Sequence, residues 1–420
     1  MTFSKTSKKE NAIADEVYAY LIFAYAASLP LRFNLKSPLL LALLVFFLWD
    51  TFLKKNRQFS YPRKKAFLAL VVYYAVCLAS LLYSDQVKGT LNFIILQGSL
   101  PLLPILFHKR LSPKQIQTAL LVFSLSCFCL SVYATIDISR QYFEKYPAHW
   151  HQLQEIDWTF FSYFLPQNIH FHAPYYSLYI GTCLIIHSYF LYSTKYAQNK
   201  ASFVLHLFFC LFFFGFQALL SSRTALVATV LMIALVCVYL AFKAGKYLAL
   251  VAIILCTVGA SVLVFQKVTY LRIKFSESAG VTQRKMMWTS AFDIIKEHPV
   301  FGISPGESES ALVERYKSNQ FQEGITSHFD AHNQFIMHGV SLGLVGAVAL
   351  LLVLFFLLKE AFQRKNYLLF CFVAVFAICC LTESLLQRRD GTLLFSFITS
   401  LLLFAPRNLQ PEKEIKEMAV

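Results

Sequence analysis

The segment His328 to Asn333, with the sequence HFDAHN, gathers side chains that can accept, donate or hold a proton. An apolar run long enough to cross a membrane follows it directly, and polar groups at the edge of a membrane span usually have a function. His332 has an intrinsic pKa near neutrality, so it can take a proton from a substrate hydroxyl. The positive end of the helix that follows would favour an anionic substrate.

Two other interpretations fit the same segment. His328, Asp330 and His332 alternate, and an extended strand would point all three to one side as metal ligands, with further ligands supplied from elsewhere. In the second, Asn333 caps the following helix and the histidines only face water. Catalysis is the favoured interpretation, and either His328 or His332 can be the base. His338, nearly two turns into the apolar run, is predicted to be a hydrogen-bonded core histidine.

Arginines are the second chemical signal, because a guanidinium stays charged and offers a planar donor fork that suits phosphate oxygens. Arginine is disfavoured in the outer loops of a membrane protein, so those found there need a reason. Snorkelling or pairing with a carboxylate is the structural alternative, and it is weakest for Arg223, which lies in a minimal turn between two spans. The candidate anion-binding arginines are Arg223, Arg284, Arg388 and Arg389.

The composition shows what must position these residues. The 420 residues are 57% hydrophobic and only 15% charged, which excludes an ordinary soluble enzyme. Twelve apolar runs are long enough to cross a hydrocarbon core of about 30 Å as helices. We therefore predict an all-α polytopic membrane protein of about 12 transmembrane helices. The runs fall near residues 16–34, 38–53, 66–83, 90–107, 118–137, 172–193, 203–220, 224–243, 247–265, 335–358, 367–382 and 392–406.

The net charge of +15 reflects membrane topology rather than nucleic-acid binding. Lysine and arginine are concentrated in alternate connections, such as KKNRQFSYPRKK at 54–65 and KEAFQRK at 359–365. The positive-inside rule then predicts that both termini are cytoplasmic and that residues 138–171 and 266–334 lie outside. The predicted organisation is nine N-terminal spans over 1–265, an outer loop domain over 266–334, three spans over 335–406 and a cytoplasmic tail over 407–420.

The outer loop domain is predicted to be partly helical. Residues 281–298 place Trp288, Ala291, Phe292 and Ile295 on one helical face, as expected of an amphipathic helix at the outer surface, and Pro299 should end it. A second helix is predicted from SALVERYKSNQF. All ten cysteines fall within predicted spans as core residues, and neither a Cys/His metal spacing nor a nucleotide-binding motif occurs. We expect no cofactor and no metal, so the substrate itself must supply the energy of any reaction.

A known family shares these motifs. His332-Asn333, followed by an apolar helix with stepped Gly339 and Gly343, resembles the signature of the O-antigen ligase superfamily. That superfamily includes O-antigen ligases, related polymerases and O-linked protein oligosaccharyltransferases. The stretch RKMMWTSAFDIIKEHPVFGISPGES resembles the family's Arg-x-x-x-Trp helix with a Pro- and Gly-rich turn, and SSRTAL around Arg223 resembles another motif. The resemblance covers roughly residues 205–350, and His328 and Asp330 are not family positions.

The resemblance implies a GT-C-like glycosyltransferase that works at the periplasmic face of the bacterial inner membrane without nucleotide sugar or metal. The donor would be an undecaprenyl-pyrophosphate-linked glycan and the acceptor lipid A-core, with membrane lipids around the protein and no nucleic-acid partner. Arg223 and Arg284 would grip the pyrophosphate, with Arg388 and Arg389 as further anion contacts. His332 would act as the base, or orient the acceptor hydroxyl, in an inverting attack. Apart from the resemblance, we expect Asn333, His328 and Asp330 to support His332. An O-antigen polymerase is the alternative, followed by a protein O-oligosaccharyltransferase and a polysaccharide transporter.

Overall fold

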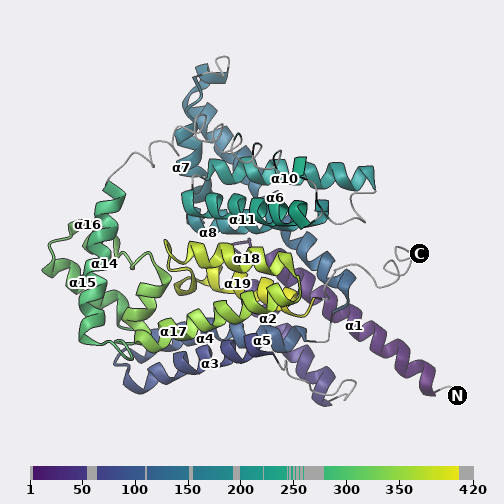
Figure 1. Cartoon of the computed structure of the whole chain (residues 1–420), viewed down its shortest axis with the longest axis horizontal. Coiled ribbons are helices and arrows are strands. Elements are labelled where there is room, and N and C mark those ends of the chain that lie inside the picture. Colours follow the sequence, from purple (N-terminus) through teal and green to yellow (C-terminus); the bar gives the residue numbers. More distant parts are fainter. Residues whose placement is uncertain are drawn as a thin grey trace.

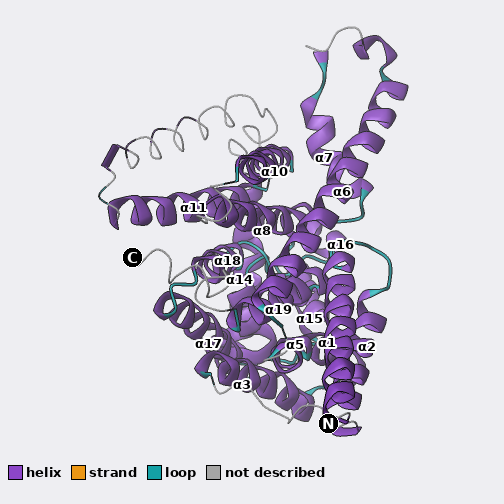
Figure 2. Cartoon of the chain, turned by 90° about the vertical axis from the view of Figure 1, so that its right-hand side faces the viewer, coloured by secondary structure: helices purple, strands orange, loops and turns teal. Residues whose placement is uncertain are grey.

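The computed structural model describes residues 3–53, 64–108, 111–150, 155–192, 199–220, 222–243 and 279–405, together with isolated positions between 245 and 259. The described part is built from helices and connecting loops, and most of the helices run side by side in one bundle (Figures 1 and 2). Three helices, α14 (Ala279–Glu297), α15 (Ser308–Ser318) and α16 (Gln322–Ser327), cover one end of this bundle, which we call the capped end. The N-terminal end of α1 (Phe3–Ser28) lies at the opposite end (Figure 1).

Eleven of the twelve predicted spans coincide with described helices, and the twelfth, at 247–265, lies outside the described residues except for isolated positions. Among the described residues, seven helical stretches are long and apolar enough to cross a membrane. The bundle helices are α1, α2 (Lys36–Leu48), α3 (Lys65–Ala79), α4 (Val87–Gln97), α5 (Ser99–Phe107), α6 (Pro113–Lys145), α8 (Ala173–Tyr192), α10 (Lys200–Leu219), α11 (Arg223–Lys243), α17 (Gln334–Gln363), α18 (Tyr367–Cys379) and α19 (Arg389–Leu403). A π-helical turn, η1 (Trp49–Leu53), extends α2, and a 3-10 turn, η2 (Ser80–Tyr83), extends α3.

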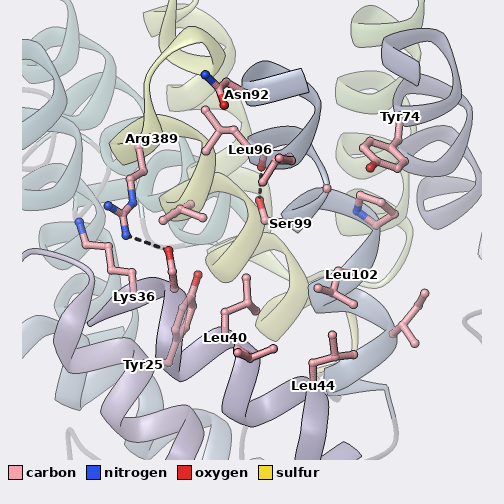
Figure 3. A pocket seen from close by; sticks show the side chains of 17 residues that line it. Tyr25, Lys36, Leu40, Leu44, Tyr74, Asn92, Leu96, Ser99, Leu102 and Arg389 are labelled. Atoms are coloured by element: carbon pink, nitrogen blue, oxygen red, sulfur yellow. Dashed lines mark hydrogen bonds between the residues drawn. The ribbon is translucent and has the colours of Figure 1, made fainter. Parts of the chain in front are cut away.

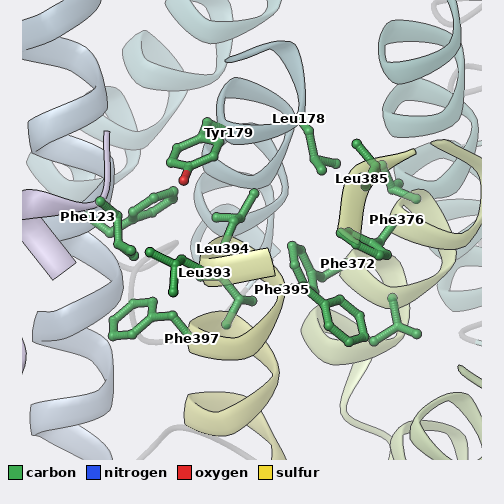
Figure 4. Close-up of a cluster of buried hydrophobic side chains, with 14 of the residues drawn as sticks. Phe123, Leu178, Tyr179, Phe372, Phe376, Leu385, Leu393, Leu394, Phe395 and Phe397 are labelled. Atoms are coloured by element: carbon green, nitrogen blue, oxygen red, sulfur yellow. The ribbon is translucent and has the colours of Figure 1, made fainter. Parts of the chain in front are cut away.

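The centre of the bundle is formed by α8 and α19. Almost every residue of α19 is buried, and so are fourteen residues of α8. Phenylalanine and leucine side chains of α6, α8, α18 and α19 meet there in one core (Figure 4). These two helices face protein instead of lipid, so they can carry buried hydroxyls, such as those of Ser396 and Tyr179, which donate to backbone carbonyls.

The cap, which consists of α14 to α16 and the turns between them, is joined to α17 by main-chain hydrogen bonds. The turn at 299–304 docks on α17, where the N–H groups of Ile303 and Ser304 donate to the carbonyls of Val340 and Ser341 over 3.0 Å each. Gly343 interrupts the helix with a φ of 64°, and a Cβ there would overlap the main chain of Val300. Gly343 therefore allows a close approach, and the segment that approaches it is this turn of the cap rather than another membrane helix.

Two local predictions were only partly right. Pro299 follows the end of α14 as predicted. Ala291 is buried as predicted, but the other fully buried residues of this face are Met287 and Ile294, and Phe292 is exposed. The segment after residue 137, predicted to be an outer loop, continues α6 to Lys145, and α7 (Trp158–Asn168) returns beside it. A Ser112–Gln115 capping box starts α6, and its apolar residues continue past the predicted end, so nothing stops the helix there.

Candidate active site

The segment that carries the two histidines forms a fixed turn between the cap and α17. The main chain of His332 has a φ of 42°, and its N–H donates to Asp330 Oδ1 over 2.7 Å. Ser384 Oγ donates to the same carboxylate oxygen over 3.0 Å. From the cap, Trp288 Nε1 donates to the carbonyl of Ala331 over 3.0 Å. The turn is therefore held from both sides, and its side chains have defined directions.

The imidazole of His332 is paired with a carboxylate from a distant part of the chain. Its Nδ1 lies 3.2 Å from Glu383 Oε2, and both side chains are largely buried. A carboxylate at Nδ1 fixes the ring so that Nε2 is left for another partner, and it stabilises the imidazolium that forms when Nε2 takes a proton. This is the arrangement that a general base requires.

The pKa of His332 is set by opposing effects. Burial alone lowers the pKa, but the hydrogen bond to Glu383, the Glu383 charge and the Asp330 charge together outweigh burial and the repulsion from Arg284. The net result is a pKa raised above its ordinary value of 6.5. His332 is thus a stronger base than a free histidine.

The loop that carries Glu383 is fixed to the start of α17. Asn333 caps this helix, as the second of the two alternative interpretations expected, accepting from the N–H of Phe335 over 3.0 Å, and its own amide donates to the carbonyl of Leu381. Gln334 accepts from the N–H of Leu386 over 2.5 Å. His338 is buried and hydrogen-bonded, as predicted, with Nε2 3.0 Å from the Tyr73 hydroxyl. These bonds keep the distance between His332 and Glu383 constant.

A polar cavity of about 390 Å³ opens beside this pair. Its lining residues come from four separate parts of the sequence. Five of these residues were predicted as site residues. They are His328, Asp330, His332, Arg388 and Arg389, joined by Arg32, His172, Tyr175, Ser327, Phe329, Glu383 and Asp390. The volume lies within the range of about 300 to 1,000 Å³ that is usual for ligand sites.

The cavity is electrostatically divided into two halves. Asp330 and Glu383 face His332, whereas the cations are gathered at the start of α19. There Arg32 and Lys36 both contact Asp390, over 3.2 Å and 3.3 Å. Arg388 is exposed on the cavity lining, and its guanidinium has neither an ion pair nor a hydrogen bond within the part of the chain that the structure describes. A cation in this state can bind an anionic group without first breaking another contact.

Four helices start at the rim of the cavity. His332 precedes α17, His172 precedes α8, Arg389 begins α19, and Lys36, beside Asp390, begins α2. Helix N-termini carry partial positive charge, so the convergence of four of them adds to the attraction for an anion. Burial together with the Arg388 and His332 charges lowers the pKa of His172, which leaves that ring neutral at the centre of this field.

Two of the predicted arginines do not line the cavity. Arg284 is half-buried on α14, near enough to His332 that its charge affects the pKa of the imidazole. Arg223 is the first residue of α11. Two turns further along α11, Thr229 lies against Gly181, which is two turns into α8. Near the other end of α11, Tyr239 contacts Tyr367 at the start of α18. Arg223 therefore lies at the capped end, together with the cavity.

The alternation of His328, Asp330 and His332 does not produce a common metal site. His328 points to Glu309, with Nδ1 3.1 Å from Oε1, while His332 points to Glu383 and Asp330 bonds the main chain. Among the described residues, no group of three His, Cys, Asp or Glu side chains is placed to hold a metal ion. The turn, with φ near 50° at His328, replaces the extended strand on which the metal interpretation depended.

Four residues at the cavity were not predicted as site residues from the sequence: Arg32, Lys36, His172 and Tyr175. A signal was present for two of them, because Arg32 and Lys36 are cations in a predicted outer loop, the same argument that singled out Arg388 and Arg389. His172 and Tyr175 carried no comparable signal. They reach the cavity only because α8 starts beside it.

Comparison with known proteins bears on the family of this chain. Residues 208–351 match the family model described as O-Antigen ligase, which confirms the resemblance drawn from the motifs. The match runs from α10 to α17 and includes Arg223, Arg284 and His332, whereas Glu383, Arg388 and Arg389 lie beyond it. A stretch of 87 residues is also 32% identical to a protein of Haemophilus influenzae described as uncharacterized, covering 21% of this chain and 22% of that protein.

Proposed function

Because residues 208–351 carry an O-antigen ligase domain, we propose that the protein transfers a glycan from undecaprenyl pyrophosphate to lipid A-core. The reaction would take place at the periplasmic face of the bacterial inner membrane, with the capped end outside and both termini in the cytoplasm. The observation that carries the proposal is the His332–Glu383 pair in a cavity whose other side is lined by arginines. An O-antigen polymerase, which transfers to another lipid-linked glycan, is the alternative within the family.

In the proposed reaction an acceptor hydroxyl attacks the anomeric carbon of the donor sugar. The new glycosidic bond forms as the bond between that carbon and the pyrophosphate oxygen breaks, so the configuration inverts. Nε2 of His332 takes the hydroxyl proton, and Glu383 stabilises the imidazolium. Undecaprenyl pyrophosphate leaves with the bonding electrons, and the guanidinium groups stabilise the charge that develops on its phosphates. The donor's pyrophosphate ester supplies the free energy.

The two family functions are distinguished by a deletion strain whose lipid-linked glycans and lipopolysaccharide are separated by size. Loss of a ligase leaves long glycan chains on the undecaprenyl carrier and bare lipid A-core. Loss of a polymerase leaves single repeat units attached to the core. A strain with unchanged lipid-linked glycans and unchanged lipopolysaccharide would contradict both.

The raised pKa of His332 predicts a specific pH dependence. The base must be neutral, so transfer should increase with pH as His332 loses its proton, with a midpoint above the ordinary histidine value. Glu383→Gln removes the charge that raises this pKa, so the midpoint should move to lower pH and the maximal rate should fall. The measurement is initial rate against pH for both proteins in proteoliposomes. An unchanged midpoint in Glu383→Gln would show that Glu383 does not control the base.

The directions of the three side chains in the turn predict that transfer does not depend on a divalent metal. Initial rates in proteoliposomes should be the same with EDTA and with added Mg²⁺, since the arginines, rather than a metal ion, neutralise the pyrophosphate. A rate that EDTA abolishes and a divalent ion restores would contradict this account.

A further inference from the structure

A second basic site lies at the C-terminal end of α19, at the end of the bundle opposite the cap. A cavity of about 180 Å³ opens there, and we call it the basic pocket; its lining includes Lys64, His108, Leu111, Arg364, Ser400 and Phe404. About 10 to 15 Å³ already holds one water, so the basic pocket has room for a group of several heavy atoms. It shares no lining residue with the hollow between α2 and α5 in Figure 3, whose cations Lys36 and Arg389 belong to the capped end.

Three basic connections of the sequence meet at the basic pocket. Lys64 directly precedes α3, His108 follows the end of α5, and Arg364 follows the end of α17. The connections that supply them are residues 54–65, 108–114 and 359–365. The positive-inside rule predicts that all three face the cytoplasm. Basic pockets between membrane helices on that side commonly bind acidic lipid head groups.

The two cations of the pocket hold the end of α19 and still keep free donors. Lys64 Nζ donates to Glu360 Oε1 over 2.9 Å and to the carbonyl of Leu403 over 2.7 Å. Arg364 donates to the carbonyls of Leu403 and Ala405 over 2.6 Å and 2.8 Å. An ammonium has three N–H groups and a guanidinium five, so the contacts among the described residues use only part of these donors. Both cations share one carboxylate, that of Glu360, and the group keeps a net positive charge.

The wall of the pocket also carries a buried hydroxyl. Ser400 is fully buried on α19, and its Oγ has no hydrogen-bond partner among the described residues. On the same helix, the hydroxyls of Ser396 and Thr399 donate to main-chain carbonyls. Burying a hydroxyl without a partner is unfavourable, so Ser400 calls for an acceptor from outside the described chain. An oxygen atom of a ligand in the pocket can be that acceptor.

We propose that the basic pocket binds the phosphate of an anionic phospholipid of the bilayer, with phosphatidylglycerol as the simplest example. Its phosphate oxygens would accept from Lys64, Arg364 and Ser400. The head group of a zwitterionic lipid brings its own ammonium, which the two cations would repel. A lipid fits better than free phosphate because Leu68, one turn into α3 from Lys64, is 60% exposed on a membrane-spanning stretch, so acyl chains can lie beside it.

A lipid bound here would stabilise the bundle rather than take part in transfer. Ser400 lies eleven residues after Arg389 on α19, roughly 15 to 20 Å away at about 1.5 Å per residue. The phosphate would join the beginning of α3 to the ends of α17 and α19, and α17 and α19 both start at the cavity beside His332.

The direct test titrates the full-length protein in detergent with single lipids and measures each binding event by native mass spectrometry. We expect the first phosphatidylglycerol to bind about tenfold more tightly than phosphatidylethanolamine, because charge-assisted contacts hold it. Inorganic phosphate at the same concentration should not compete, since it lacks the acyl chains. Equal affinity for the two lipids would overturn the proposal, and competition by inorganic phosphate would assign the pocket to a free anion instead.

Substitutions locate the binding event. Ser400→Ala should weaken the first phosphatidylglycerol by about tenfold, the factor that one hydrogen bond to a charged group provides, and Arg364→Gln at least as much. Lys359→Gln is the matched control, because it removes a positive charge from the exposed side of α17 at the same end of the bundle. Its lipid affinity should equal that of the wild type. Equal losses in Lys359→Gln and Arg364→Gln would reduce the effect to overall charge and overturn the pocket.

Thermal unfolding in nanodiscs distinguishes a ligand contact of Ser400 from a structural one. In phosphatidylcholine, Ser400→Ala should unfold at the same temperature as the wild type or higher, because the lost hydroxyl has no partner among the described residues. In phosphatidylglycerol the wild type should gain stability through binding, and Ser400→Ala should gain less. A Ser400→Ala protein that loses stability in phosphatidylcholine, or that gains as much as the wild type in phosphatidylglycerol, would contradict the assignment.

Discussion

His332→Ala should abolish transfer, with a loss of about 10²- to 10⁴-fold, the usual contribution of a positioned general base. The expected product pattern is undiminished donor with no glycan on the acceptor. The physical reason is that Nε2 is the atom left available when Glu383 occupies Nδ1. The measurement is transfer by purified protein in proteoliposomes with lipid-linked donor and lipid A-core.

His328→Ala is the informative comparison, because the sequence left both histidines as candidate bases. His328 is exposed and is directed toward Glu309, so its replacement should cost far less activity. His149→Ala, on the projecting α6–α7 hairpin, controls for loss of an unrelated histidine. If the His332→Ala protein folds and still transfers glycan while the His328→Ala protein is inactive, then His328 rather than His332 is the base.

Arg223→Lys should lose most transfer activity, on the order of 10²-fold if this arginine clamps the pyrophosphate as charge develops. Lysine keeps the charge but lacks the planar fork that binds two phosphate oxygens together. Expression and thermal stability should not change, because the substitution keeps a long cationic side chain at the start of α11. The measurement is the initial transfer rate at saturating acceptor.

The matched control for this substitution is Arg140→Lys. Arg140 is 68% exposed on α6 and contacts Asp137 and Glu144 of its own helix, so it should tolerate lysine without a change in rate. Full activity of Arg223→Lys would remove Arg223 from the phosphate clamp. The anion would then be bound by the cations that line the cavity alone, among which the Arg388 guanidinium has no ion pair or hydrogen bond within the described residues.

Local chemistry made part of this site predictable from the sequence. Asn333 is a strong cap residue directly before an apolar run, so the start of α17 followed from it. Pro299 likewise indicated the end of α14, and His338 was too deep in the apolar run to be anything but a hydrogen-bonded core residue. For the two helix ends the decisive interaction lies within a few residues of the signal, whereas the partner of His338, Tyr73, comes from a distant segment.

The rest depended on contacts between distant segments. Glu383 lies fifty-one residues from His332, and nothing in TESLLQRRDG specifies that this carboxylate turns toward the imidazole. The pairing exists because Asn333 and Gln334 tie the 380–386 loop to the start of α17. The break of α17 at Gly343 is similar, since the turn that occupies it comes from the cap.

The central claim is tested most directly by the structure of the His332→Ala protein in nanodiscs with the lipid-linked donor bound. We predict that the diphosphate lies in the cavity, within hydrogen-bond distance of Arg388 or Arg389, with the anomeric carbon of the sugar facing position 332. A diphosphate bound outside this cavity, for example beside Lys64 and Arg364 at the other end of the bundle, would contradict the account.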